Sequence, residues 1–101
     1  AKLKKGAIII NTARGGLVDE QVLADALKTG QVGAIGFDVF DDEPPAASHP
    51  FTGFDQAILT PHNAALTAEC AERMAVQSVQ NVLDFFAGRL DAGLIVNKDQ
   101  I

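Results

Sequence analysis

The sequence of 101 residues contains no tryptophan, no tyrosine and a single cysteine. One cysteine cannot form an internal disulfide, so nothing marks the chain as a disulfide-stapled secreted scaffold. Positive charge is also scarce, because 8 Lys and Arg face 13 Asp and Glu, which gives a net charge of −5. Surfaces that bind nucleic acid need clustered positive charge, so this composition disfavours a nucleic-acid partner.

Long hydrophobic runs are missing as well. Near the N-terminus the apolar run from Ala7 to Ile10 has only four residues. A signal peptide needs a longer apolar stretch with a cleavage site, and a membrane span needs about 20 apolar residues. We therefore expect a cytoplasmic protein with no membrane partner. The hydrophobic content of 48% favours a folded globular domain over disorder.

Three short β-rich runs alternate with helical segments. Strands are predicted for residues 7–11, 34–39 and 57–60, and the first of them, being continuously apolar, is expected to be covered on both faces. Residues 41–54 contain three prolines and one glycine (Pro44, Pro45, Pro50 and Gly53), which predicts a loop there. A short strand candidate, residues 94–96, lies in the C-terminal tail.

Two helices are predicted between and after these strands. Asp19 is a plausible N-cap for a first helix that ends at Gly30, and Thr67 can cap a long helix to about Ala87, with Gly88 ending it. The long helix carries an apolar stripe that we expect to face inward, made of Ala71, Met74, Ala75, Ser78, Val79, Val82, Leu83 and Phe86.

This alternation of strands and helices predicts an α/β fold with a parallel sheet. Three strands make a narrow sheet, and a continuously apolar first strand needs neighbours and cover on both sides. The chain also begins with Ala1 rather than with methionine. We therefore interpret the sequence as a fragment of a larger domain, with its strands forming part of a wider sheet.

The first polar motif, Asn11-Thr12-Ala13-Arg14-Gly15-Gly16, directly follows the first predicted strand. Ligands of open parallel sheets bind beyond the carboxyl ends of the strands, which is where Arg14 falls. The planar guanidinium of an arginine there can bind a carboxylate through two parallel hydrogen bonds. A surface arginine at a turn explains this motif, taken alone, equally well.

Acidic and histidine residues follow the other two strands. Residues 38–43 hold four carboxylates, whose mutual repulsion predicts that at least one has a raised pKa, although a solvated acidic loop is the better interpretation of this segment alone. His62 follows the third strand and titrates near neutrality, so it can exchange a proton at working pH, but a lone histidine is more often structural. His49, beside Pro50, has no such placement and is interpreted as structural.

The three motifs are more specific together than separately. Because the carboxyl ends of parallel strands share one edge of the sheet, Arg14, an acid near Glu43 and His62 are expected at a common rim. Such a set can bind an anionic carboxylate, take a proton and orient the base that takes it.

Three stretches resemble the D-isomer-specific 2-hydroxyacid dehydrogenases: residues 6–19 (GAIIINTARGGLVD), 36–44 (GFDVFDDEP) and 59–62 (LTPH). The match runs in order through most of the chain. The resemblance implies a partial Rossmann-like, doubly wound parallel sheet. It also implies that residues 1–87 are the C-terminal half of an NAD(P)-binding domain, followed by a tail, residues 88–101, that returns to the substrate domain.

The same resemblance implies roles for individual residues. Arg14 would bind the substrate carboxylate, Glu43 would support the histidine, and His62 would be the general acid/base, while Asp38 resembles the residue that meets the nicotinamide carboxamide. The other cofactor contacts that it implies are Thr12, Ala13, Arg14, His62, Asn63, Ala64 and Ala65. The reaction would be a reversible hydride transfer between NAD, or else NADP, and a small 2-hydroxy or 2-oxo acid such as phosphoglycerate, glyoxylate or hydroxypyruvate. We expect a homo-oligomer, such as a homodimer, and no metal.

Two departures from the family pattern matter. The dinucleotide fingerprint GxGxxG is absent, because no two glycines are separated by a single residue. That loop places the pyrophosphate at a helix N-terminus, so we expect this chain alone to be inactive or nearly so. The segment Asn63-Ala64-Ala65 stands where many family members carry an aliphatic residue and glycines, which leaves the substrate open.

Two other functional classes compete with the dehydrogenase hypothesis. The first is a non-catalytic fragment that folds only as an oligomer, by pairing its sheet or its long helix with another copy. The second and weaker one is a small acidic metal-binding domain that uses Asp38, Asp41, Asp42 and His62.

Overall fold

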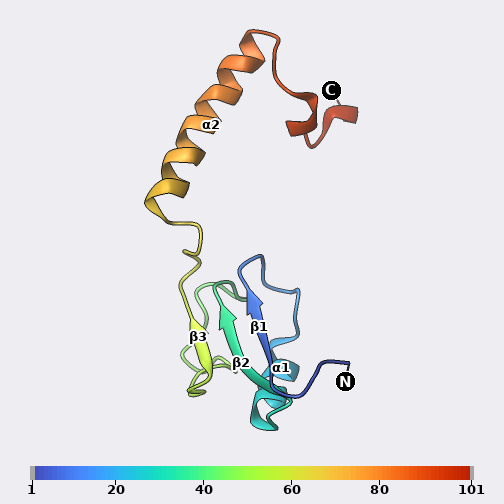
Figure 1. The fold of residues 1–101 in the computed structure, drawn as a ribbon, viewed down its shortest axis with the longest axis vertical. Coiled ribbons are helices and arrows are strands. Elements are labelled where there is room, and N and C mark those ends of the chain that lie inside the picture. Colours follow the sequence, from blue (N-terminus) through green and yellow to red (C-terminus); the bar gives the residue numbers. More distant parts are fainter. Residues whose placement is uncertain (1, 101) are drawn as a thin grey trace. The chain divides into compact units, whose positions relative to one another are not determined.

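The computed structural model describes residues 2–100, which form two compact units, the first ending at Ala64 and the second beginning at Ala65. The elements of the first unit are β1 (Ala7–Asn11), α1 (Glu20–Lys28), β2 (Val32–Phe37) and β3 (Ala57–Leu59) (Figure 1). The elements of the second are α2 (Ala68–Phe86) and two short 3-10 helices, η1 (Ala92–Leu94) and η2 (Lys98–Gln100).

The three strands form one parallel sheet in the order β1-β2-β3. Ile10 of β1 lies opposite Gly36 of β2, which in turn lies opposite Ile58 of β3. Because all three strands run in the same direction, the loops that follow them leave from the same edge of the sheet (Figure 1). The predicted α/β fold with a three-stranded parallel sheet is therefore confirmed.

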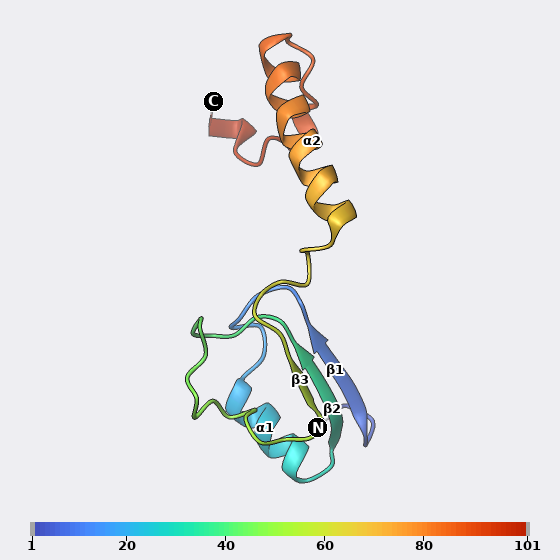
Figure 2. The same cartoon turned by 90° about the vertical axis from the view of Figure 1, so that its left-hand side faces the viewer.

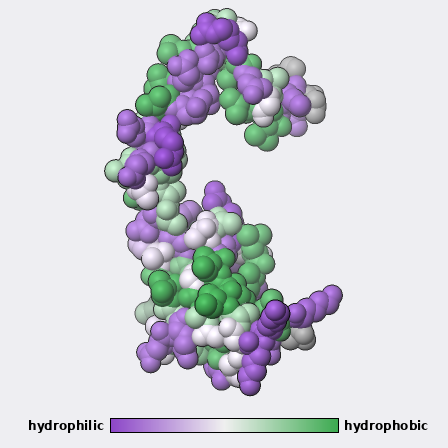
Figure 3. All heavy atoms as spheres, viewed as in Figure 1, coloured by the Kyte–Doolittle hydropathy of each residue, from purple (hydrophilic) through white to green (hydrophobic). Residues whose placement is uncertain are grey.

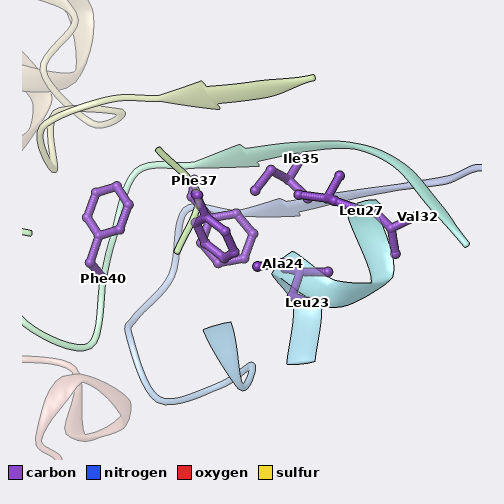
Figure 4. Close-up of a cluster of buried hydrophobic side chains, with 8 residues drawn as sticks. Leu23, Ala24, Leu27, Val32, Ile35, Phe37 and Phe40 are labelled. Carbon is purple, nitrogen blue, oxygen red and sulfur yellow. The ribbon is translucent and has the colours of Figure 1, made fainter. Parts of the chain in front are cut away.

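Apolar side chains fill one side of the sheet, the side that carries α1 and the connection from β2 to β3 (Figure 2). Helix α1 starts where predicted, since the Asp19 carboxylate accepts a hydrogen bond of 2.9 Å from the N–H of Val22. Figure 4 shows most of the buried cluster, which consists of Leu23, Ala24, Leu27, Val32, Ile35, Phe37, Phe40 and Phe51.

The opposite face of the sheet has no cover within the first unit. Ile8, Ile10 and Ile58 are 70%, 71% and 71% exposed, and Figure 3 shows apolar side chains gathered on this face over the strands. The expectation that the first strand is covered on both faces is therefore wrong for this chain, because α1 and the β2–β3 connection both lie on the other side. This open face is consistent with the interpretation of a fragment of a wider domain.

The second unit is built on the predicted long helix. Helix α2 has Thr67 as its N-cap, whose side chain accepts a hydrogen bond of 3.1 Å from the N–H of Cys70, and the chain reverses at Gly88, where φ is +66°. No α2 side chain is buried, so the stripe that we expected to face inward is exposed, with Val79 at 61% and Phe86 at 82%. Within residues 2–100, no helix combines the length and the apolar character that crossing a membrane requires.

The second strand begins and ends two residues earlier than predicted, at Val32 and Phe37 rather than at residues 34 and 39. The N–H of Asp38 still donates to the carbonyl oxygen of Asn11, at 3.0 Å, but its carboxylate turns to the loop after β3. The regular strand ends at Phe37, directly before Asp38.

The predicted strand at residues 94–96 is also wrong. The 3-10 helix η1 (Ala92–Leu94) overlaps the predicted strand. Asp91 is the N-cap of η1, and its carboxylate accepts a hydrogen bond of 2.8 Å from the N–H of Gly93. An aspartate that binds the backbone two residues further on favours a turn over an extended strand.

Phe51 anchors the β2–β3 connection in the core, because its ring is buried and meets that of Phe37 edge to face at 4.9 Å. We expect Phe51→Ala to lower the free energy of unfolding by about 3 to 5 kcal/mol, as burial is lost and a cavity remains. Phe86→Ala removes the same atoms from an exposed position and should change this free energy by less than about 0.5 kcal/mol. Urea unfolding of both variants measures the difference, and equal effects would contradict this core assignment.

Candidate active site

A histidine and a glutamate from two different loops meet at the carboxyl edge of the sheet. Nδ1 of His62, which follows β3, lies 2.7 Å from Oε2 of Glu43, which belongs to the β2–β3 connection. The other oxygen of Glu43 accepts a hydrogen bond of 3.0 Å from the N–H of Phe40. Both side chains are open to solvent, with 50% of His62 and 36% of Glu43 exposed, so a small molecule can reach them.

The charge state of this pair follows from its contacts. The hydrogen bond from His62 is the largest cause that lowers the pKa of Glu43, followed by the bond from the N–H of Phe40, and the positive charge of Arg14 acts in the same direction. A carboxylate only accepts hydrogen bonds, so Nδ1 of His62 carries a proton. Nε2 is then the nitrogen that can take up or release a proton.

The backbone of His62 is held in an uncommon conformation. Its φ is +51°, in the left-handed region that residues other than glycine uncommonly adopt. Asp38 fixes this loop on both sides of His62. Its Oδ1 accepts a hydrogen bond from the Thr60 hydroxyl at 2.5 Å and another from the N–H of Asn63 at 2.9 Å. Oδ2 of Asp38 accepts from the N–H of Ala64 at 2.9 Å. Asp38 thus positions the loop that presents His62.

The carboxylates of the acidic segment do not repel one another as expected. Asp38 is only 3% exposed, yet its pKa is lowered, chiefly by the hydrogen bond from Thr60 and further by the backbone N–H groups of the His62 loop. The prediction of a raised pKa is therefore wrong for Asp38 and for Glu43. The reason is that these carboxylates point to different hydrogen-bond donors. Asp38 and Glu43 accept hydrogen bonds from the His62 loop, whereas Asp41 accepts one from the loop after β1.

The loop after β1 is shaped by Asn11, a residue that the sequence did not single out. Its side-chain amide donates to the carbonyl oxygen of Arg14 at 2.8 Å, and its side-chain oxygen accepts from the N–H of Ala13 at 3.1 Å. Arg14 is exposed, and its guanidinium donates to the carbonyl oxygen of Ala13 at 2.6 Å. An asparagine as the last residue of an otherwise apolar strand is the local signal that could have indicated this turn.

The loops that carry Arg14 and Glu43 are joined to each other. The carboxylate of Asp41 accepts a hydrogen bond of 2.5 Å from the N–H of Gly16. Gly15 packs so closely against the next loop that an added Cβ would overlap the backbone carbonyl of Phe40. A side chain at position 15 would therefore separate the two loops.

The structure thus brings together most of the predicted site residues. A pocket of about 310 Å³ lies beside the His62–Glu43 pair and is lined by Phe40, Glu43, Pro44, Pro45, Pro61 and His62. Thr12, Ala13 and Arg14 form the loop at the end of the neighbouring strand, and Arg14 acts on Glu43 through its charge rather than through a hydrogen bond. Ala65 is the first residue of the second unit.

The residues of the metal-binding alternative make other contacts. Among the side chains that the structure describes, no group of three His, Cys, Asp or Glu is arranged to hold a metal ion. Asp38 and Asp41 instead accept hydrogen bonds from backbone N–H groups, and Asp38 accepts one from a hydroxyl as well.

Comparison with known proteins shows the family to which this chain belongs. The family described as D-isomer specific 2-hydroxyacid dehydrogenase, NAD binding domain, matches residues 1–64. A glyoxylate reductase from Thermofilum pendens is 43% identical over 97% of this chain, and a glycerate dehydrogenase from Methylorubrum extorquens is 48% identical over 87% of it. The chain spans 29% of the length of each of these two relatives.

A solved structure shows the same fold. It is that of a D-isomer specific 2-hydroxyacid dehydrogenase from Xanthobacter autotrophicus in complex with NADPH and MES. It matches this chain with a TM-score of 0.78 at 34% identity, covering 97% of this chain and 39% of the other.

The lowered pKa of Asp38 predicts how stability depends on pH. A carboxylate whose pKa is lower in the folded chain than its ordinary 3.8 stabilises the fold above that value, and this contribution is lost as the pH falls through the folded pKa. The free energy of unfolding should therefore fall between about pH 5 and about pH 2, and Asp38→Asn should make that fall smaller. Thr60→Val, which removes one donor, should have an intermediate effect. Urea unfolding across this pH range measures it, and an unchanged pH dependence in Asp38→Asn would contradict the assignment.

Proposed function

This chain belongs to the D-isomer-specific 2-hydroxyacid dehydrogenase family, and on that premise we propose that it supplies the acid–base and carboxylate-binding groups of an NAD(P)-dependent oxidoreductase. The substrate would be a small 2-hydroxy or 2-oxo acid, as the names of the glyoxylate reductase and glycerate dehydrogenase relatives suggest. The observation that carries the proposal is the 2.7 Å contact of His62 with Glu43, at the same edge of the sheet as Arg14.

His62 would act as the general acid/base through Nε2. In the direction of oxidation, Nε2 takes the proton of the substrate hydroxyl, and the imidazole becomes positively charged. The carboxylate of Glu43, hydrogen-bonded to Nδ1, stabilises that charge and keeps the ring oriented. In the direction of reduction, Nε2 returns the proton to the carbonyl oxygen.

Arg14 would bind the substrate carboxylate. Its guanidinium is exposed at the end of β1, and its planar set of N–H donors fits the two oxygens of a carboxylate. Glu43, Asp38 and Asp41 leave the surrounding rim acidic, so Arg14 is the group there that attracts an anion. We expect a carboxylate held by Arg14 to orient the neighbouring carbon atom toward His62.

The dinucleotide would lie along the carboxyl ends of the strands, as in other open parallel sheets. When bound, its nicotinamide ring donates or accepts the hydride. Asp38 fits a carboxamide contact, because its Oδ2 accepts one hydrogen bond, from Ala64, and keeps a lone pair. The full set of proposed cofactor contacts is Thr12, Ala13, Arg14, Asp38, His62, Asn63, Ala64 and Ala65.

The remaining organisation is proposed on the same basis. Residues 1–87 would belong to the cofactor domain, and residues 88–101 would lead back to the substrate domain. The exposed apolar side chains of α2, Phe86 among them, support a homo-oligomer.

A hybrid enzyme tests the proposed function directly. In this hybrid enzyme, the chain replaces the matching segment of the Thermofilum pendens glyoxylate reductase, to which it is 43% identical. We expect it to oxidise NADH or NADPH in the presence of glyoxylate, whereas the isolated 101-residue chain should not, because it lacks the GxGxxG loop. Loss of absorbance of the reduced cofactor measures turnover. A hybrid enzyme that folds and binds the cofactor but has no activity would refute the proposal.

Replacing the acid/base is expected to affect turnover rather than substrate binding. His62→Gln in the hybrid enzyme should lower kcat by about 10²- to 10⁴-fold, the usual contribution of a positioned proton-transfer group. Asp55→Asn, at an exposed position in the turn before β3, serves as the control and should leave kcat unchanged. If His62→Gln retained full kcat, the acid–base assignment would be wrong.

Replacing Arg14 is expected to weaken the binding of the oxo acid. Arg14→Gln removes hydrogen bonds to a charged group, worth about 1.5 to 3 kcal/mol, so KM for glyoxylate should rise by about 10- to 100-fold. Arg89→Gln is the matched control, because Arg89 pairs with Asp84 at 2.8 Å in the second unit. Steady-state kinetics of the hybrid enzyme give both values. A KM that is equal in the two variants would exclude Arg14 as the carboxylate-binding residue.

A further inference from the structure

A second histidine–carboxylate pair lies beneath the loop that carries Glu43. Nε2 of His49 is 2.8 Å from Oε2 of Glu20, the first residue of α1. Unlike the exposed pair at the sheet edge, these side chains are only 9% and 12% exposed. Burying such polar groups costs free energy unless each polar atom has a hydrogen-bond partner. The hydrogen bonds of this pair must therefore offset the cost of removing it from water.

Every side-chain polar atom of this pair has a hydrogen-bond partner. The N–H of Phe51 donates to Nδ1 of His49 at 3.3 Å, so the ring proton lies on Nε2 and is donated to Glu20. The other oxygen of Glu20 accepts from the N–H of Asp41 at 3.1 Å. Glu20 therefore holds the connection at two points, residue 41 and residue 49.

The imidazole of His49 also packs against the residue that holds Glu43. Its ring meets the ring of Phe40 edge to face at 5.2 Å and that of Phe51 at 5.0 Å. The backbone N–H of Phe40 donates to Oε1 of Glu43. A shift of His49 would therefore be passed through Phe40 to the carboxylate that binds His62.

We propose that the Glu20–His49 pair is a positioning device for Glu43. By holding both ends of segment 41–49, which has no helix or strand of its own, it keeps the Glu43 carboxylate against Nδ1 of His62. From the sequence alone, His49 was interpreted as structural. The catalytic consequence of this positioning rests on the proposed function, whereas the positioning itself does not.

The unmodified chain provides the first test. The ¹⁵N chemical shifts of the His49 imidazole distinguish its two neutral tautomers. The proposal requires a proton on Nε2, donated to Glu20, and an unprotonated Nδ1. A proton on Nδ1 would overturn it, since the hydrogen bonds that fix segment 41–49 could not then form.

Variants of the 101-residue chain provide the second test, with the pKa of Glu43 as the readout from carboxyl-carbon NMR. His49→Phe keeps an aromatic ring but removes both nitrogens, and we expect it to raise the pKa of Glu43 toward its ordinary value. His49→Gln can again donate to Glu20 and should restore the lower pKa in part. Glu20→Gln, which keeps one of the two carboxylate contacts, gives a smaller rise and serves in place of His49→Phe if that variant does not fold.

Leu27→Ala separates positioning from a general loss of stability. Leu27 is a buried core residue in the last turn of α1, about 10 Å along the helix from Glu20. Leu27→Ala should destabilise the chain without changing the pKa of Glu43. The proposal is overturned if His49→Phe leaves this pKa at its value in the unmodified chain, or if Leu27→Ala raises it as much as His49→Phe does.

The hybrid enzyme extends the test to catalysis. His49→Phe should lower kcat by as much as about 100-fold, the effect of a misplacement near 1 Å, with a much smaller change in KM for glyoxylate. Leu27→Ala should leave kcat unchanged at a temperature where both variants are folded. An unmodified hybrid enzyme that is inactive would count against the proposed function alone, because the NMR readouts need no activity. An unchanged kcat in His49→Phe would count against positioning alone.

Discussion

Parallel pairing of the three strands governs how the proposed site is assembled. Because β1, β2 and β3 run in one direction, the segments that follow them all begin at the same edge of the sheet. Arg14, Glu43 and His62 are up to 48 positions apart in sequence, yet this arrangement brings their loops together. With one strand reversed, the loop after it would begin at the opposite edge, and no shared site could form.

Hydrogen bonds to carboxylates turn these neighbouring loops into a defined site. Asp38 fixes the loop around His62, Asp41 joins the second loop to the first through Gly16, and Glu43 meets the imidazole itself. Each carboxylate accepts hydrogen bonds from backbone N–H groups, a hydroxyl or a histidine. For Asp38 and Glu43 these donors lower the pKa, so the ionised forms are stabilised although the two acids lie close in sequence. The same bonds fix the orientation of the loops, and among the side chains that the structure describes no buried N or O atom lacks a hydrogen-bond partner.

The core and the site share side chains, so stability and function are linked. Phe40 and Phe51 belong to the buried cluster, and both pack against the ring of His49. Phe40 also donates its N–H to Glu43, so the core that α1 builds under the sheet reaches the proposed catalytic pair. The opposite face, where Ile8, Ile10 and Ile58 are exposed, takes no part in this support.

Local signals in the sequence identified the three strands and the two α-helices, although β2 is shifted by two residues and the predicted strand at residues 94–96 is wrong. Apolar β-branched runs identified the strands, and Asp19 and Thr67 were identifiable as caps because a cap binds a backbone group only three residues away. The motifs after the strands indicated Arg14, Glu43 and His62 because parallel strands deliver their ends to one edge. Only the tertiary structure decided where the carboxylates point, what His49 binds and which sheet face stays open. The bond of Asp38 to Ala64 spans 26 positions and that of His49 to Glu20 spans 29, and the packing of the whole unit, rather than any local pattern, sets such distances.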